Sequence, residues 1–161
     1  MPLAHRPVAE HDLPLIRTFS QSAKELFFLF PAATFPLTVA QLQAAMAGRA
    51  KATVVELGGE VAALADLYRW QTSGHRAIGN VIIAPAAGCR GAGQYLVERM
   101  IDEALATCRA ADVPVSCFSG NAAGLLFYPK LGSQPYAIEA RQDRQGRRVA
   151  LIHLRLRREA T

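Results

Sequence analysis

Three glycines in a short loop between a predicted strand and a predicted helix are the residues with the clearest chemical potential. Gly88, Gly91 and Gly93 stand among small residues in the segment 85–93, which follows an apolar stretch and precedes a helical pattern. Glycines let backbone N–H groups approach a ligand closely, and the N-terminus of a helix carries partial positive charge. The pattern is typical of a phosphate-binding site. A plain loop that packs a helix against a strand is the alternative.

The residues around these glycines exclude two common phosphate-binding motifs. A P-loop requires a lysine directly after its last glycine, and no lysine follows Gly91 or Gly93. A dinucleotide fingerprint requires a third glycine where this chain has Leu96, and an acidic residue at the end of the next strand, where it has 119–121 (Ser-Gly-Asn). A phosphate-bearing ligand at this loop would therefore belong to a class that neither of these two motifs binds.

A second motif begins about thirty residues after the loop and gives the chain its family resemblance. The segment 121–132 reads NAAGLLFYPKLG, which is similar to the N-x-x-A-x-x-x-Y-x-K-x-G ending of the GNAT N-acetyltransferase superfamily. The segment 83–93, IAPAAGCRGAG, resembles the V-x-P-x-x-[QR]-x-x-G-x-[GA] loop that cradles the pyrophosphate of acetyl-CoA in that family. Both motifs occur in the family's order, within residues 80–132.

The resemblance implies a fold and a set of roles. The implied fold is α/β, with a mixed sheet of six or seven strands, about four flanking helices, and two splayed strands (77–84 and 113–118) around the pantetheine arm. The implied activity is direct transfer of an acetyl group from acetyl-CoA to a primary amine of a small molecule or peptide. Tyr128 is implied as the acid that protonates the leaving thiolate, since a phenol is neutral at pH 7. The implied cofactor-binding residues are Ile82, Ile83, Gly88, Cys89, Arg90, Gly91, Ala92, Gly93 and Asn121.

Three residues depart from the family pattern. Gly88 stands where Gln or Arg is usual, so a side-chain donor is lost, and Arg90 is the candidate to replace its charge. Gly124 replaces an alanine, which weakens a short helix by about 1 kcal/mol. Pro129 removes an N–H and biases Tyr128 away from helical backbone angles. Gly88 and Pro129, together with Ala77 where many family members have a glutamate, support an alternative function, a non-catalytic acyl-CoA-binding domain that binds the cofactor without turnover.

The base that deprotonates the acceptor amine is left open. Many family members place a glutamate where this chain has Ala77. Asp66 stands in a predicted strand among Ala and Leu, and burial there would raise its pKa. An ordered-water relay is an equal alternative. The candidate residues are Glu25, Glu56, Asp66 and His75.

The segment 24–35 is predicted to line the acceptor pocket, because the family builds that wall from this region. Four aromatic residues stand there with little charge: Phe27, Phe28, Phe30 and Phe35. They predict an acceptor with an apolar or aromatic body beside its amine. The alternative is that they belong to the core.

The cysteines and histidines give no sign of a nucleophile or a metal site. Cys89 and Cys117 have no histidine close in sequence and are interpreted as packing residues. The chain has no CxxC pair and its four histidines lack metal-ligand spacing, so we predict no metal.

Periodicity and turn residues place these motifs within a mixed α/β order. The apolar residues after Gly91 recur with a helical period up to Asp112, and Gly58 and Gly59 form a predicted hairpin turn. Further helices are predicted over 12–23, 38–48 and 121–127. Strands are predicted over 6–8, 53–57, 61–70, 77–84, 113–118, 136–141 and 149–156.

Composition predicts a single globular domain over residues 1–161. With 51% hydrophobic and 19% charged residues, the chain of 161 residues is not of the disordered class. Three cysteines and the lack of an apolar N-terminal run predict a cytoplasmic protein. No membrane span is expected, because Pro31 interrupts the longest apolar stretch, 26–35.

The net charge of +5 is concentrated near the end of the chain. Seven of the eighteen basic residues are arginines within the last 21 positions. We interpret them as a solvated terminal hairpin and not as a nucleic-acid-binding face, because few aromatic residues lie between them. The strand 149–156 is expected near the sheet edge, where it could pair with a second subunit in a homodimer.

Overall fold

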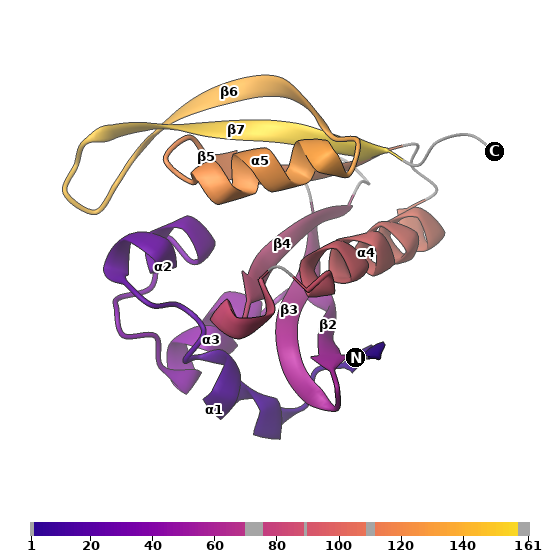
Figure 1. Ribbon diagram of the computed structural model, residues 1–161. Coiled ribbons are helices and arrows are strands. Elements are labelled where there is room, and N and C mark those ends of the chain that lie inside the picture. Colours follow the sequence, from indigo (N-terminus) through magenta and orange to yellow (C-terminus); the bar gives the residue numbers. More distant parts are fainter. Residues whose placement is uncertain (1, 70–75, 89, 109–111, 158–161) are drawn as a thin grey trace.

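The computed structural model describes residues 2–69, 76–88, 90–108 and 112–157 of the chain (Figure 1). Over these residues the chain forms seven strands and five α-helices, which confirms the predicted α/β class. None of the helices within these ranges is long and apolar enough to cross a membrane. The strands are β1 (Leu3–Pro7), β2 (Ala50–Leu57), β3 (Glu60–Arg69), β4 (Arg76–Ile83), β5 (Asp112–Phe118), β6 (Gln134–Gln142) and β7 (Arg148–Arg157). The helices are α1 (Leu13–Ile16), α2 (Ala23–Leu29), α3 (Val39–Met46), α4 (Ala92–Cys108) and α5 (Ala122–Lys130), with short 3₁₀ turns at Glu10–Asp12 and Pro85–Ala87.

The sheet has the strand order β1-β2-β3-β4-β5-β7-β6. Strands β1 to β4 form an antiparallel meander, and α4 carries the chain across to β5, which runs parallel to β4. Residues 149–156 lie near the edge as expected, but β7 pairs with β5 on one side and β6 on the other, so its backbone is not free to pair with a second subunit. Leu151, Leu154 and Leu156 of β7 are buried, whereas β6 is mostly exposed, so the more apolar strand takes the inner position.

Strands β4 and β5 separate soon after they meet, as the resemblance implied. The register that pairs them within the described residues is Ile78 with Val115. Beyond it β4 carries a bulge, because Leu64 pairs with Ile82 whereas Asp66 pairs with Gly79, which leaves one extra residue in β4. Asn80 lies in this bulge with a φ of 50°. The bulge bends β4 at this point, and within the described residues Ile78 with Val115 is its one register pair with β5.

Apolar layers cover the two faces of the sheet. On one face α4 packs Leu96, Val97 and Met100 against strand residues that include Val115. On the other face α1, α2 and α3 pack residues such as Ile16, Leu26 and Leu42 against the meander. Figure 1 shows α4 and α5 apart from α1 to α3, with the β6–β7 hairpin reaching over α2.

The predicted helix over 12–23 is wrong. The chain has one turn of helix, α1, and then a separate helix, α2, whose N-cap Ser22 accepts a hydrogen bond from the Glu25 N–H at 3.1 Å. The pattern Ser-x-x-Glu at 22–25 is a helix-start signal that the sequence contains. The prediction that Thr38 begins a helix is confirmed, since its hydroxyl accepts from the Gln41 N–H at 3.1 Å.

Candidate functional site

The glycine-rich segment forms a turn that ends in the first turn of α4. Gly91 has a φ of 83°, a left-handed conformation that favours glycine. The Tyr95 N–H donates to the Gly91 carbonyl at 3.0 Å, so the amides between them lie at the helix start, where N–H groups lack helical partners. The positive end of a 17-residue helix and free backbone donors therefore meet at one place.

A cavity of about 790 Å³ lies between this turn, β4, α2 and α5. Six of the residues that the sequence indicated line it: Ile83, Gly88, Gly91, Gly93, Asn121 and Tyr128. The backbone of α4 at Gly93 lies close to β4, since a Cβ on Gly93 would be 2.7 Å from Ile83 Cδ1. Phe28 of the predicted acceptor wall also lines it, as do residues that the sequence did not single out for the site: Ser22, Lys24, Leu29, Val81, Gln94, Ala122, Ala123 and Lys130.

The other predicted cofactor-binding residues lie elsewhere. Ile82 is 1% exposed and its side chain belongs to the apolar layer under α1 to α3. Ala92 is fully buried against the opposite layer, and Arg90 is exposed but does not line the cavity. The side chains of Ile82 and Ala92 point into the core, because of alternation along β4 and the turn of α4, so the implied contacts of these two residues with the cofactor stay a prediction for their backbone groups. Cys89 lies outside the described residues.

Tyr128 reaches the cavity from α5 and is almost fully buried. Burial, with the nearby Cys117 and Tyr68 groups, raises the pKa of Tyr128 well above its ordinary value, so its phenol stays protonated. The expected bias of Tyr128 away from helical angles does not occur, because Pro129 lies in the last turn of α5 and Tyr128 stays helical. Its carbonyl accepts the Leu131 N–H at 3.0 Å.

Two features fix the position of α5. Asn121 caps the helix as predicted, with Oδ1 accepting the Gly124 N–H at 3.1 Å. A Cβ on Gly124 would lie only 2.7 Å from the Cys117 Sγ on β5, so glycine allows the helix to approach the strand. Burial raises the pKa of the Cys117 thiol to about 11, which agrees with a packing role and not with a nucleophile.

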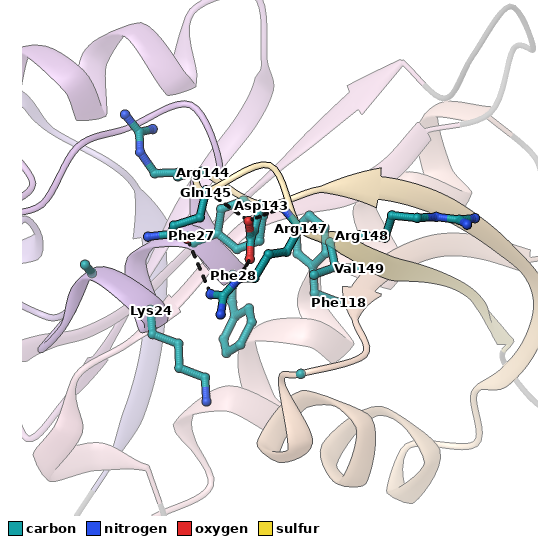
Figure 2. Close-up of a pocket in the computed structure, with 12 residues that line it drawn as sticks. Lys24, Phe27, Phe28, Phe118, Asp143, Arg144, Gln145, Arg147, Arg148 and Val149 are labelled. Carbon is teal, nitrogen blue, oxygen red and sulfur yellow. Dashed lines mark hydrogen bonds and ion pairs between the residues drawn. The ribbon is translucent and has the colours of Figure 1, made fainter.

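A second cavity of about 660 Å³ lies between α2, the end of β5 and the β6–β7 hairpin (Figure 2). Lys24, Phe28 and Gly120 line both cavities, so the two are adjacent. Phe27, Phe28 and Phe118 form its aromatic wall, with the Phe27 and Phe118 ring centroids 4.7 Å apart.

Two of the four aromatic residues that the sequence placed in the acceptor wall line this cavity, and its role as the acceptor pocket stays a prediction. Phe27 and Phe28 line the second cavity. Phe30 is 3% exposed in the core, and Phe35 is 41% exposed but lines neither cavity, so the prediction is wrong for these two. The helix α2 is the reason, because it presents its adjacent Phe27 and Phe28 toward β5 while Phe30 ends it on the core side.

The arginine-rich hairpin contributes to this cavity, which sequence reasoning missed. The Arg144 guanidinium donates to the carbonyls of Pro31 at 3.3 Å and Ala33 at 3.0 Å, and to the Thr34 hydroxyl at 3.1 Å. These bonds tie the hairpin turn to the loop after α2. The described lining residues of the cavity include four cationic side chains, on Lys24, Arg144, Arg147 and Arg148, and one acidic side chain, on Asp143.

Charge pairing leaves the cavity mouth positive. The Asp143 carboxylate already accepts from Arg147 Nε and from two backbone N–H groups, each at 2.9 Å. Lys24 and Arg148 make no ion pair with any residue that the structure describes. Sequence alone could not locate this charge, because the lysine and the arginine stand more than a hundred positions apart.

The structure separates the candidate bases. Glu56 accepts from Arg6 at 2.8 Å on the β1–β2 side and lines neither cavity. Asp66 is fully buried and accepts from Asn80 at 2.7 Å and Arg49 at 3.2 Å; burial raises its pKa to about 6, in the direction expected. Glu25 lines the first cavity. His75 lies outside the described residues.

Comparisons with known proteins agree with this geometry. The sequence pattern of the acetyltransferase (GNAT) family matches residues 16–132. No curated protein sequence matches the chain.

Several solved structures share the fold. A ribosomal-protein-alanine N-acetyltransferase from Brucella melitensis is similar with a TM-score of 0.76 and 17% identity, over 96% of this chain and 99% of that one. The putative acetyltransferase yncA from Salmonella typhimurium, solved with its cofactor acetyl-CoA, has a TM-score of 0.74 and 21% identity, over 100% and 98% of the chains. A putative phosphinothricin N-acetyltransferase has a TM-score of 0.77 and 18% identity, over 99% and 100%.

Proposed function

The chain belongs to the GNAT acetyltransferase family, and we propose that it moves the acetyl group of acetyl-CoA to the amine of a small acceptor. The single observation that carries the proposal is the contact between the two cavities through Lys24, Phe28 and Gly120. One cavity has the donors that phosphates require, and the other has an aromatic wall and an open mouth. An acyl donor and an amine would meet where the two adjoin.

The first cavity suits the acyl donor. Its volume of about 790 Å³ lies within the usual range for small-molecule sites. The backbone donors at the start of α4 would hold the pyrophosphate, and the gap between β4 and β5 leaves Val81 and Ile83 beside the pantetheine arm. Gly88 has room for a ligand or a side chain, since a Cβ there would have only the Pro85 carbonyl within 4 Å, at 3.7 Å.

The reaction proceeds by direct attack. The neutral amine nitrogen attacks the thioester carbonyl carbon, the C–S bond breaks, and the CoA sulfur leaves as a thiolate. Tyr128 gives its phenolic proton to that sulfur, and its raised pKa means that it holds a proton until the thiolate forms. Tyr128 faces the first cavity, so the acid lies on the acyl-donor side.

The second cavity indicates the acceptor class. Phe27, Phe28 and Phe118 would pack against an apolar body, while Lys24 at the mouth would attract an anionic group at the far end from the amine. We therefore propose an acceptor that joins an amine, an apolar body and an anion such as a carboxylate. A polyamine lacks the anion and would place further positive charge beside this cation.

Two measurements test the function in sequence. A thermal-shift titration with acetyl-CoA and CoA should raise Tm, with NADH and ATP as negative controls. At 100 times Kd the stabilisation is about 2.7 kcal/mol, which is several degrees for a domain of this size. Binding without turnover of any amine would favour the non-catalytic alternative, and no shift at millimolar acetyl-CoA would refute both.

The acceptor class is tested with a matched pair of amines. 4-(2-Aminoethyl)benzoate and 2-phenylethylamine differ only in the carboxylate, and the first should have the higher kcat/KM by about fivefold to tenfold. Lys24→Gln should reduce this ratio, whereas Lys51→Gln, on β2 outside both cavities, should not. Equal kcat/KM values for the two amines, or faster acetylation of spermidine, would refute the proposed acceptor.

A further inference from the structure

A chain of hydrogen-bonded side chains crosses the sheet, and none of the steps above uses it. Ser116 Oγ on β5 lies 2.7 Å from His153 Nδ1 on β7. The other ring nitrogen, Nε2, lies 3.2 Å from Glu139 Oε1 on β6. Tyr68 on β3 is also hydrogen-bonded to Ser116. Four strands therefore contribute one continuous polar path.

The path begins on the sheet face that the second cavity covers. Ser116 follows Val115, the β5 residue that pairs with Ile78 where β4 and β5 part. Strand alternation places Ser116 on the same sheet face as Phe118. The register partner of Ser116 on the neighbouring strand β7 is His153. Phe118 lines the second cavity, so the hydroxyl lies on the acceptor's side of the sheet.

Exposure changes along the path in a way that suits proton movement. Ser116 is half-buried, His153 is 5% exposed, and the Glu139 side chain is 43% exposed. The imidazole thus lies between a hydroxyl at the strand gap and a carboxylate in contact with solvent.

The hydrogen bonds define the direction of each donor. The pKa of Glu139 is lowered, chiefly by its hydrogen bond with Arg141 and then by that with His153, so the carboxylate is ionised and only accepts. The His153 Nε2 must then carry the hydrogen. In the neutral imidazole Nδ1 is the acceptor, and the Ser116 hydroxyl donates to it.

We propose that Ser116 and His153 relay the proton that the acceptor amine must lose before it attacks. The ammonium gives a proton to Ser116 Oγ while the Ser116 hydroxyl proton passes to His153 Nδ1, so one N–H bond breaks and one forms. The amine becomes neutral and the imidazolium is paired with Glu139, through whose exposed side it returns a proton to water. The proposal rests on the proposed acetyl transfer and supplies its missing base.

The groups around His153 come from four strands. Glu139 contacts it from β6, and Arg141 is hydrogen-bonded to Glu139. The Tyr136 ring of β6 lies 6.2 Å away, centroid to centroid, and Arg155 of β7 stacks on that ring at 4.0 Å. From β3 and β5 the neighbours are the neutral hydroxyls of Tyr68 and Ser116. The one carboxylate among these groups is in direct contact with the imidazole.

The first test changes Glu139 and leaves the relay in place. The pH dependence of kcat/KM is measured with two acceptors whose amines differ in pKa, so a limb at the same pH for both belongs to the enzyme. Glu139→Gln removes the charge that favours the imidazolium and should move this acid limb to lower pH by several tenths of a unit. Glu60→Gln, an exposed change on the β2–β3 hairpin, should leave it unmoved.

The second test removes the proton acceptor. His153→Asn keeps a polar group toward Ser116 but cannot take up a proton, and Ser116→Ala interrupts the path. Each should lower kcat by about 10²-fold to 10⁴-fold and abolish the acid limb. The KM for the amine and the acetyl-CoA thermal shift should stay near the wild-type values. A purely structural histidine would leave the limb in place.

An NMR titration separates this proposal from the acetyl transfer itself. The His153 ring signals, assigned by their loss in His153→Asn, should titrate at lower pH in Glu139→Gln. Turnover with an acid limb that Glu139→Gln leaves unmoved would overturn the relay. Acetyl-CoA binding without turnover of any amine would instead overturn the proposed function. If His153→Asn fails to fold, as judged by circular dichroism, the exposed Glu139→Gln variant decides alone.

Discussion

Replacement of Gly124 by alanine opposes two effects that can be weighed from the structure. Helix propensity favours alanine by up to about 1 kcal/mol. The added Cβ would lie 2.7 Å from Cys117 Sγ and 2.9 Å from Asn121 Nδ2, closer than ordinary van der Waals contact. Overpacking of this kind costs about 1–3 kcal/mol, because α5 must move away from β5 or the cap must break. Overpacking outweighs propensity, so we expect Gly124→Ala to destabilise the protein by about 1–2 kcal/mol.

The assay is urea unfolding of four proteins in a double-mutant cycle. Cys117→Ala removes the sulfur that the new methyl group meets, so Gly124→Ala should cost less in that background, with a coupling of about 1 kcal/mol. In thermal unfolding the single variant should lose roughly 2–4 °C of Tm per kcal/mol. A Gly124→Ala variant more stable than wild type, or a coupling of zero, would refute the close approach of α5 to β5.

Three further predictions test separate parts of the protein. Gly88→Arg should fold normally, because the backbone of Gly88 has helical φ and ψ of −59° and −30°. This variant should lower the acetyl-CoA Kd up to about fivefold, as measured by calorimetry. Gly91→Arg should instead lose stability, because Gly91 has a φ of 83°. Tyr128→Phe should lower kcat by about 10²-fold or more with an unchanged acetyl-CoA Kd, and an unchanged kcat would exclude Tyr128 as the acid. The hydrogen bond from Arg6 lowers the pKa of Asp12 to about 2. The free energy of unfolding of the wild type should therefore fall as the pH drops from about 4 to about 2. Over the same pH range, the difference in free energy of unfolding between the wild type and Asp12→Asn should vanish.

Local sequence determined much of the fold around the first cavity. The strand, glycine turn and helix over 77–108 follow from alternation, small residues and a helical period, each of which acts within a few residues. Asn121 and Thr38 begin their helices as predicted, because a cap needs only a side chain and an N–H three positions later. The same reasoning could have found α2 from Ser22 and Glu25.

Gly124 and Gly91 differ in how far their roles can be predicted from the neighbouring sequence. Sequence predicted that Gly124 weakens α5, and the structure gives the opposite role, since only glycine lets the helix pass Cys117 at this distance. Propensity describes a helix in isolation, whereas the contact depends on a strand from another part of the chain. Gly91 differs, because its positive φ is a property of the turn itself.

Only the tertiary structure decided the second cavity and the hydrogen-bonded path beside it. Strand order placed β7 inside the sheet and the arginine-rich hairpin over α2, where it lines the second cavity. It also brought Ser116 and His153, 37 positions apart, to 2.7 Å, and joined them to Glu139 on the edge strand. No local pattern specifies such pairs, because the register between strands is set by the burial of whole sheet faces and not by the residues that meet.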